Sequence, residues 1–95
     1  MEKNRTATTT TTEDIYELSD LILGGDIKNT DGVAIQQHWT YKGQDFFLNL
    51  SKPNSESISN VIKKAKATNT PIRLTLSNAN IIESVEEIRY PKYQN

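Results

Sequence analysis

The sequence contains no cysteine, which excludes disulfide bonds, thiolate zinc sites and cysteine nucleophiles. It also lacks any apolar run near the ~18 residues that a membrane-spanning helix needs. Its N-terminus has no apolar segment of the kind that signal peptides carry. We therefore expect a cytoplasmic protein that does not bind a membrane.

An excess of either charge is missing too. The 11 Lys and Arg residues are matched by 12 Asp and Glu residues, so the chain has no global basic field that would attract nucleic acid. Only 35% of the 95 residues are hydrophobic, which is a low share for a small domain. This shortage favours burial of further apolar area in a homodimer or against a protein partner.

Large aliphatic side chains are absent from the N-terminus. After Met1, residues 1–12 hold a run of five Thr and no aliphatic residue larger than Ala, so we expect them to form a disordered tail. Residues 13–90 then form a single small domain. Residues 91–95 form a C-terminal tail.

The most strongly patterned segment is residues 33–51. Two alternating runs flank Lys42 and Gly43, which predicts a β-hairpin closed by a two-residue turn. Pairing Tyr41 with Gln44 then fixes the register. On the apolar face the pairs are Trp39–Phe46, Gln37–Leu48 and Ile35–Leu50. On the polar face they are Thr40–Asp45, His38–Phe47 and Gln36–Asn49.

Three predicted elements follow the hairpin. Residues 56–68 carry apolar side chains at helical spacing after Ser55, a candidate N-cap, and predict a helix. Residues 72–76 alternate between apolar and polar side chains and predict a strand. Residues 80–90 fit a helix or a strand about equally, because a capping-box pattern competes with β-branched residues.

The segment before the hairpin is less clear. Residues 13–23 favour an amphipathic helix that ends at Gly24 and Gly25. The rival interpretation is a long first strand over residues 18–28.

Together these elements predict an α+β fold. A small antiparallel sheet contains the 33–51 hairpin, the 72–76 strand and, if it is extended, the 80–90 segment, and it is packed by helix 56–68 and helix 13–23. The predicted core consists of Trp39, Phe46, Leu48, Ile35, Leu50, Val61, Ile62, Leu74 and Leu76. Over residues 26–90 the order of elements resembles the helix-interrupted small barrel of OB-fold proteins. This resemblance is topological and rests on no motif, so it implies an OB-like small barrel as the alternative fold and no residue-level function.

Catalytic chemistry has little support in the sequence. His38 is the only histidine, and no Ser accompanies it in a recognised arrangement, so we interpret it as a surface residue. Glu83, Glu86 and Glu87 are better explained as a solvated face than as a metal site. We therefore expect no enzymatic activity, no metal and no cofactor.

Two surfaces are candidates for binding. The polar face of the hairpin surrounds one apolar anchor with hydrogen-bonding groups, which suits recognition of another molecule. Its binding residues are Gln36, His38, Thr40, Phe47 and Asn49. The second candidate is a local positive patch. Its residues are Lys63, Lys64, Lys66 and Arg73.

These surfaces lead to two hypotheses of function. The favoured one is a non-enzymatic protein-interaction module, such as a regulator, adaptor or inhibitor, that is homo-oligomeric. The alternative is a single-stranded nucleic-acid-binding protein of OB-like type, in which the basic patch neutralises phosphates and Phe47 stacks on bases. The sequence pI of about 5.8 counts against nucleic acid.

Overall fold

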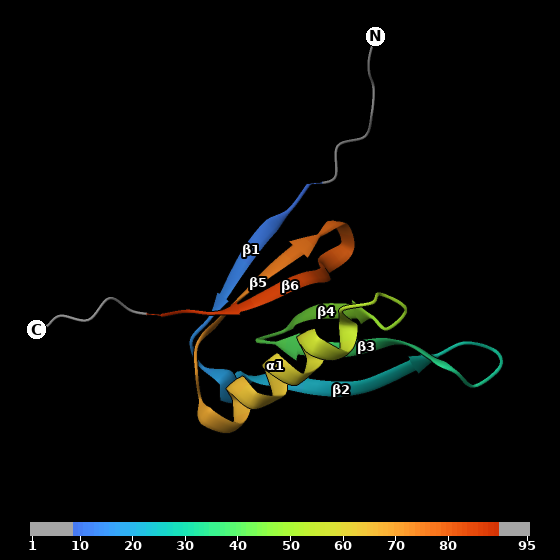
Figure 1. Ribbon diagram of the computed structural model, residues 1–95, viewed down its shortest axis with the longest axis horizontal. Helices are drawn as coiled ribbons and strands as arrows, with labels where there is room; N and C mark the ends of the chain where they lie inside the picture. The colour runs from blue at the N-terminus through green and yellow to red at the C-terminus, as the bar shows by residue number, and fades with distance from the viewer. Residues whose placement is uncertain (1–8, 90–95) are drawn as a thin grey trace, which may run out of the picture.

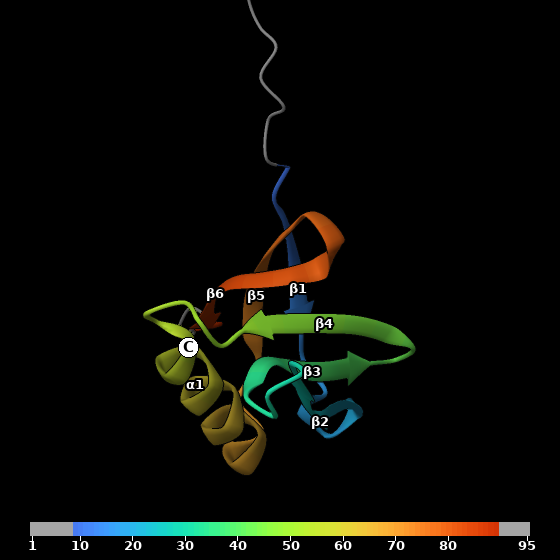
Figure 2. The same cartoon turned by 90° about the vertical axis from the view of Figure 1, so that its right-hand side faces the viewer.

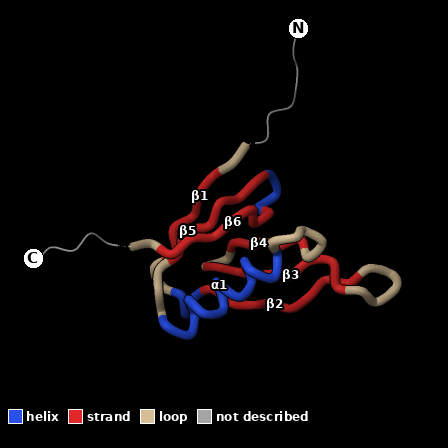
Figure 3. Tube along the Cα trace, in the orientation of Figure 1, coloured by secondary structure: helices blue, strands red, loops and turns tan. Residues whose placement is uncertain are grey.

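The computed structural model describes residues 9–89 of the chain (Figures 1 and 3). They form a six-stranded sheet, one α-helix and two short 3-10 turns. In chain order the elements are β1 (Thr11–Ile15), η1 (Leu18–Asp20), β2 (Leu21–Lys28), β3 (Ala34–Tyr41), β4 (Gln44–Asn49), α1 (Ser55–Thr68), β5 (Ile72–Ser77), η2 (Asn78–Asn80) and β6 (Ile81–Glu87).

The α+β class is confirmed, but the sheet is mixed. The strand order is β1-β5-β6-β4-β3-β2 (Figure 2). All neighbours are antiparallel except β4 and β6, which run parallel, so the expectation of a purely antiparallel sheet is wrong at this one pairing. The edge strands β1 and β2 are consecutive in the chain and are not paired with each other. The sheet is therefore open, and the small-barrel alternative is not confirmed.

The predicted hairpin and its register are confirmed for the six pairs from Tyr41–Gln44 to Gln36–Asn49. Lys42 and Gly43 both have positive φ, at 49° and 85°, as a two-residue turn between twisted strands requires. Because directly paired residues share a face, β3 and β4 present one face to the core and the other face away from it.

The predicted helix over residues 13–23 is wrong. The segment forms β1, the turn η1 and the start of β2, so the rival strand over residues 18–28 is closer to the structure. Ile15, Leu18 and Leu21 are each fully buried. Their spacing of three residues suits an amphipathic helix, but it equally suits a 3-10 turn with three residues per turn. β1 also begins at Thr11, inside the predicted tail 1–12, whereas residues 1–8 lie outside the described residues.

The later elements follow the prediction more closely. Helix 56–68 is observed as Ser55–Thr68 and ends at Asn69, which has a left-handed φ of 54°. Ser55 does not cap it as expected, because its Oγ donates to the carbonyl of Leu50 at 3.1 Å. Strand 72–76 is confirmed, and the open choice over 80–90 is decided for a strand, β6. The predicted tail 91–95 lies outside the described residues.

The core lies between the sheet and α1, which contributes Ile58, Ile62 and Ala65. Most predicted core residues are buried, but Leu50 and Val61 are only half-buried and Ile35 is 41% exposed. The physical reason is a β-bulge. Ile27 pairs with Gln36 and Lys28 pairs with Ala34, which leaves the intervening Ile35 without a partner in β2.

Candidate functional site

The hairpin's polar face is the outer face of the sheet, turned away from α1. The register brings together the five predicted binding residues, all of them half-buried. These are Gln36, His38, Thr40, Phe47 and Asn49. Gln36 Nε2 donates to Asn49 Oδ1 at 2.8 Å, so these two amides hold each other across the strands.

His38 is fixed on three sides within this face. Its ring stacks on Phe47 with 5.1 Å between centroids and 14° between planes. Its Nε2 lies 2.9 Å from Asp45 Oδ1. A Cβ at Gly24 would lie only 2.9 Å from His38 Nδ1, so the backbone there can approach only because residue 24 is glycine. The phenyl ring of Phe47 is therefore covered on one side by the imidazole and is not an open stacking platform.

The glycine pair that the sequence pattern suggests as a helix stop has a different role. Leu23 pairs with Trp39 and Gly25 pairs with His38, so Gly24 is the extra residue of a bulge in β2. Gly25 has a φ of 109°, which an L side chain rarely adopts. The bulge places His38 against β2 and keeps β2 paired with β3 on both sides of it.

The predicted positive patch is not brought together. Lys63 and Lys64 are exposed on α1, but Lys66 Nζ turns away and donates to the carbonyl of Leu18 at 3.0 Å and to that of Leu21. Lys66 therefore satisfies backbone groups at the bend between β1 and β2. Its ammonium group therefore stabilises the fold and does not lie on the same surface as those of Lys63 and Lys64.

Arg73 is engaged by carboxylates. Its Nε and Nη2 donate to the two Asp14 oxygens at 2.6 Å and 2.9 Å, and Glu86 lies 3.8 Å away. The hydrogen bonds from Arg73 hold the pKa of Asp14 below its ordinary range. The two acids neutralise the guanidinium, so Arg73 does not extend a basic surface toward Phe47.

The glutamates of β6 are also separated. Glu83 is the extra residue of a second bulge, between the Thr75–Ser84 and Leu76–Ile82 pairs, and it contacts Lys52 and accepts a 2.6 Å hydrogen bond from Ser77. The hydrogen bonds from Lys52 and then Ser77 lower the pKa of Glu83. Within residues 9–89 no three His, Asp or Glu side chains gather in a way that could hold a metal ion.

A surface that the sequence pattern does not reveal lies on the β2–β3 hairpin. Of the six large apolar side chains that are exposed among the described residues, five lie here. We call them the hairpin patch: Ile22 (56% exposed), Leu23 (40%), Ile27 (40%), Val33 (57%) and Ile35 (41%). In Figure 1 this hairpin forms the edge of the sheet, and its loop extends beyond the rest of the domain.

The hairpin patch adjoins the predicted binding face. Ile22 pairs with Thr40 and Ile27 pairs with Gln36, so both isoleucines lie on the outer face beside the His38–Phe47 stack. The only sequence signal for this surface is the glycine pair inside a strand pattern, which is typical of a bulge. The bulge shifts the alternation and puts Ile22 and Ile27, five residues apart, on the same face.

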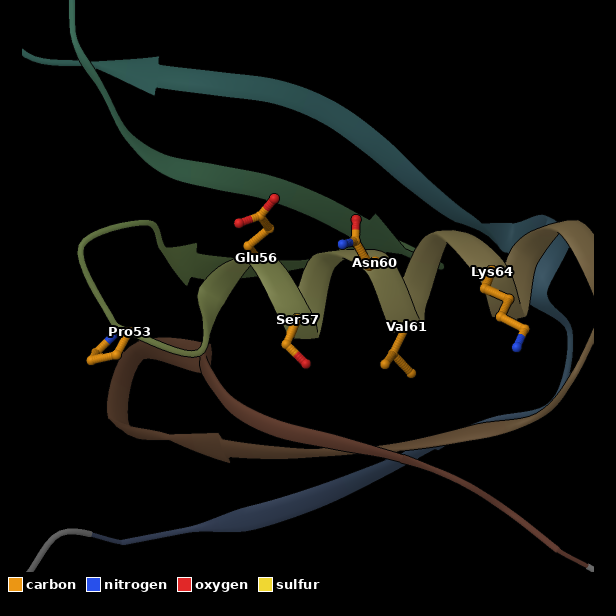
Figure 4. Close-up of a pocket in the computed structure, with 6 residues that line it drawn as sticks. All are labelled: Pro53, Glu56, Ser57, Asn60, Val61 and Lys64. Carbon is orange, nitrogen blue, oxygen red and sulfur yellow. The ribbon is translucent and has the colours of Figure 1, made fainter.

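Two hollows of the surface lie along α1, away from these residues. One, of about 510 Å³, is lined by Pro53, Glu56, Ser57, Asn60, Val61 and Lys64. Figure 4 shows that these side chains point to different sides of the helix and do not converge on one point. The other, of about 810 Å³, shares Val61 and Lys64 and extends past Arg73 and the end of β6. Neither hollow contains His38.

Comparison with known proteins does not assign a function by similarity. No helix within residues 9–89 has the length and apolar character needed to cross a bilayer. No protein-family model matches the sequence, and neither the curated proteins nor the solved structures contain a match.

Proposed function

We propose that this protein is a non-enzymatic protein-interaction module whose working surface is the hairpin patch together with the adjoining outer face of β3 and β4. The observation that carries the proposal is the gathering of five exposed apolar side chains on one hairpin at the edge of the sheet. Single exposed apolar residues need no explanation, but several on one hairpin at a sheet edge are typical of a surface that another chain covers.

The size of the patch supports a binding role of moderate strength. Full burial of an aliphatic side chain contributes about 1.5–3 kcal/mol, so covering the exposed half of each patch residue contributes about 1 kcal/mol. Five residues then supply about 5 kcal/mol from this side of the contact, whereas association costs roughly 4–15 kcal/mol. A partner must therefore add apolar contacts of its own, and the expected affinity is micromolar rather than nanomolar.

The strand arrangement supports the same face. If β1 and β2 are counted as one bent strand, the sheet has five strands and its second and third, β3 and β4, carry the proposed surface. In OB-like barrels this region binds oligonucleotides and oligosaccharides. We propose an OB-like arrangement for this chain on that basis.

The charges on this surface favour a protein over a nucleic acid. Asp26, Asp31 and Asp45 outnumber Lys28 and Lys42 on the elements that surround it. A strand of phosphates needs a positive groove to displace its counterions. A polypeptide partner has no such requirement and can use the apolar side chains directly.

A photo-crosslinking experiment tests the proposal. A benzophenone amino acid replaces Ile27 in the hairpin patch, and a matched variant carries it in place of Asn60, which is exposed on α1. Irradiation in cells of the source should give a discrete crosslinked protein, or a crosslinked dimer, from position 27 and not from position 60. Equal, diffuse labelling from both positions would refute an interaction surface on the β2–β3 hairpin.

A further inference from the structure

We propose that the partner of the hairpin patch is a second copy of this chain, and that the two copies pair antiparallel along β2 about a two-fold axis at Ile27. The inference rests on the proposed function, because it names the occupant of that surface. It is carried by the unpaired edge of β2, by the direction of its backbone groups and by two free charges of opposite sign.

β2 has a free backbone edge, and its outward-facing N–H and C=O groups lie at residues that can pair with another strand. Among residues 9–89 it is the last strand of the sheet, with β3 on one side and no strand on the other. Asn29 N–H donates to the carbonyl of Val33 at 2.9 Å, so residue 29 directs its backbone groups toward β3. By alternation Ile27 does the same, whereas Asp26 and Lys28 direct theirs outward. These two residues are the ones that can form a hydrogen-bonded pair with another chain.

The side chains favour one register. A two-fold axis at Ile27 places Asp26 of each copy opposite Lys28 of the other, which gives two cross-strand pairs of opposite charge. Within the described residues neither Asp26 nor Lys28 forms an ion pair. Ile27 meets its own counterpart on the outer face, where it is 40% exposed in the single chain.

Other registers are less favourable. An axis at Asp26 sets two aspartates against each other, and an axis between Gly24 and Gly25 sets Asp26 opposite Leu23. Charges on an edge strand normally prevent pairing with another chain. Here the two charges disfavour the two registers just described and support the one about Ile27.

The proposed ladder is short. The bulge at Gly24 interrupts β2, so the pairing extends over residues 25–29. Val33 and Ile35 lie outside this ladder, in the β2–β3 loop and in β3. An interface of this size belongs to the small, transient class, so we expect dissociation in the micromolar range or weaker.

Sedimentation equilibrium of the full chain over a wide concentration range tests this inference. The wild-type chain should form dimers. Asp26→Lys gives four lysines at the axis and Lys28→Asp gives four aspartates, so each variant alone should weaken dimerisation at least about tenfold, since two attractive cross-strand pairs become repulsive. A mixture of the two variants should restore a heterodimer, because every pair is then of opposite charge.

Controls separate the register from general charge effects. Glu56→Lys and Lys63→Asp make the same changes on exposed positions of α1 and should leave dimerisation unchanged. Circular dichroism checks that each variant is folded, and the swapped double variant Asp26→Lys/Lys28→Asp should dimerise like the wild type.

Three results would overturn the inference. A wild-type chain that stays monomeric at every concentration removes the second copy as partner, although crosslinking of another protein at position 27 would keep the proposed function. Dimers that persist in both single variants contradict the register about Ile27. Two weakened variants that fail to restore a heterodimer when mixed contradict the reciprocal pairing of Asp26 with Lys28.

Discussion

Gln37 offers the sharpest test of how the hairpin is joined to the helix. It is only 8% exposed, and its Oε1 accepts hydrogen bonds from Trp39 Nε1 at 2.8 Å and from Ser59 Oγ at 2.9 Å. Ser59 lies on α1, so this oxygen links the inner face of β3 to the helix. The change Gln37→Leu keeps a similar volume but leaves two buried donors without an acceptor.

The expected cost follows from those two donors. Each buried donor left unsatisfied costs about 1–3 kcal/mol, and the apolar replacement returns about 1 kcal/mol, so Gln37→Leu should lose about 1–5 kcal/mol of unfolding free energy. For a domain of this size, the free energy of unfolding is roughly 4–12 kcal/mol. The melting temperature should fall by about 4–8 °C for each kcal/mol lost.

Urea unfolding followed by fluorescence measures this loss, because Trp39 is the only tryptophan. Gln36→Leu is the matched control. Gln36 lies one residue away on the outer face and bonds only half-buried Asn49, so its loss should cost no more than about 1 kcal/mol. Adding Ser59→Ala to Gln37→Leu removes one orphaned donor and should return about 1 kcal/mol. If Gln37→Leu unfolds within about 0.5 kcal/mol of wild type, the buried network does not stabilise the fold as argued.

Three further predictions concern the core, the bend and the pH dependence. Trp39, at 1% exposure, should lose about 3–5 kcal/mol as Trp39→Ala, and a melting curve near that of wild type would contradict its place in the core. Lys66→Met should cost about 1–2 kcal/mol by leaving two carbonyls at the β1–β2 bend without their donor, whereas Lys63→Met on the exposed side of α1 should be neutral in thermal unfolding. The pKa of Glu83 is lowered from its ordinary value of 4.5, so its contribution is complete above pH 4.5 and is lost as pH falls through the lowered pKa. Glu83→Gln should therefore make the loss of stability below pH 4.5 shallower in acid titrations, and an unchanged slope would show that its contact with Lys52 is not formed in solution.

The hairpin can be predicted residue by residue because its information is local. A two-residue turn fixes which residues face each other, and alternation then fixes the two faces. The contact between His38 and Phe47 follows directly from that register. The same logic identifies five of the residues on the outer face from the amino-acid pattern alone.

The prediction for the first segment is wrong because its apolar spacing fits two structures. Ile15, Leu18 and Leu21 recur every three residues, and only the distant partners of β1 and β2 decide between a helix and two strands joined by a 3-10 turn. The parallel pairing of β4 and β6 is likewise a contact between segments far apart in sequence, and no local pattern encodes it.

The candidate surface is only half predictable. Bulges at Gly24 and Ile35 shift the side-chain alternation, so the exposure of Ile22, Ile27 and Ile35 cannot be obtained by counting residues along the strands. The partners of Lys66 and Arg73 depend on how long side chains reach across the tertiary structure. Sequence spacing places Lys66 and Arg73 near the other basic residues, but it does not show that each already binds acceptor groups within the fold.

The position of β1 has a consequence for the order in which the protein folds. Asp14 pairs with Arg73, 59 residues along the chain, whereas the turn between β3 and β4 spans two residues. Closing the longer loop costs more entropy, and within the described part of the chain β1 pairs with no strand other than β5. The first strand in chain order is therefore expected to be the last to gain protection, and pulse-labelled hydrogen exchange during refolding should show the amides of residues 12–14 protected after those of β3 and β4.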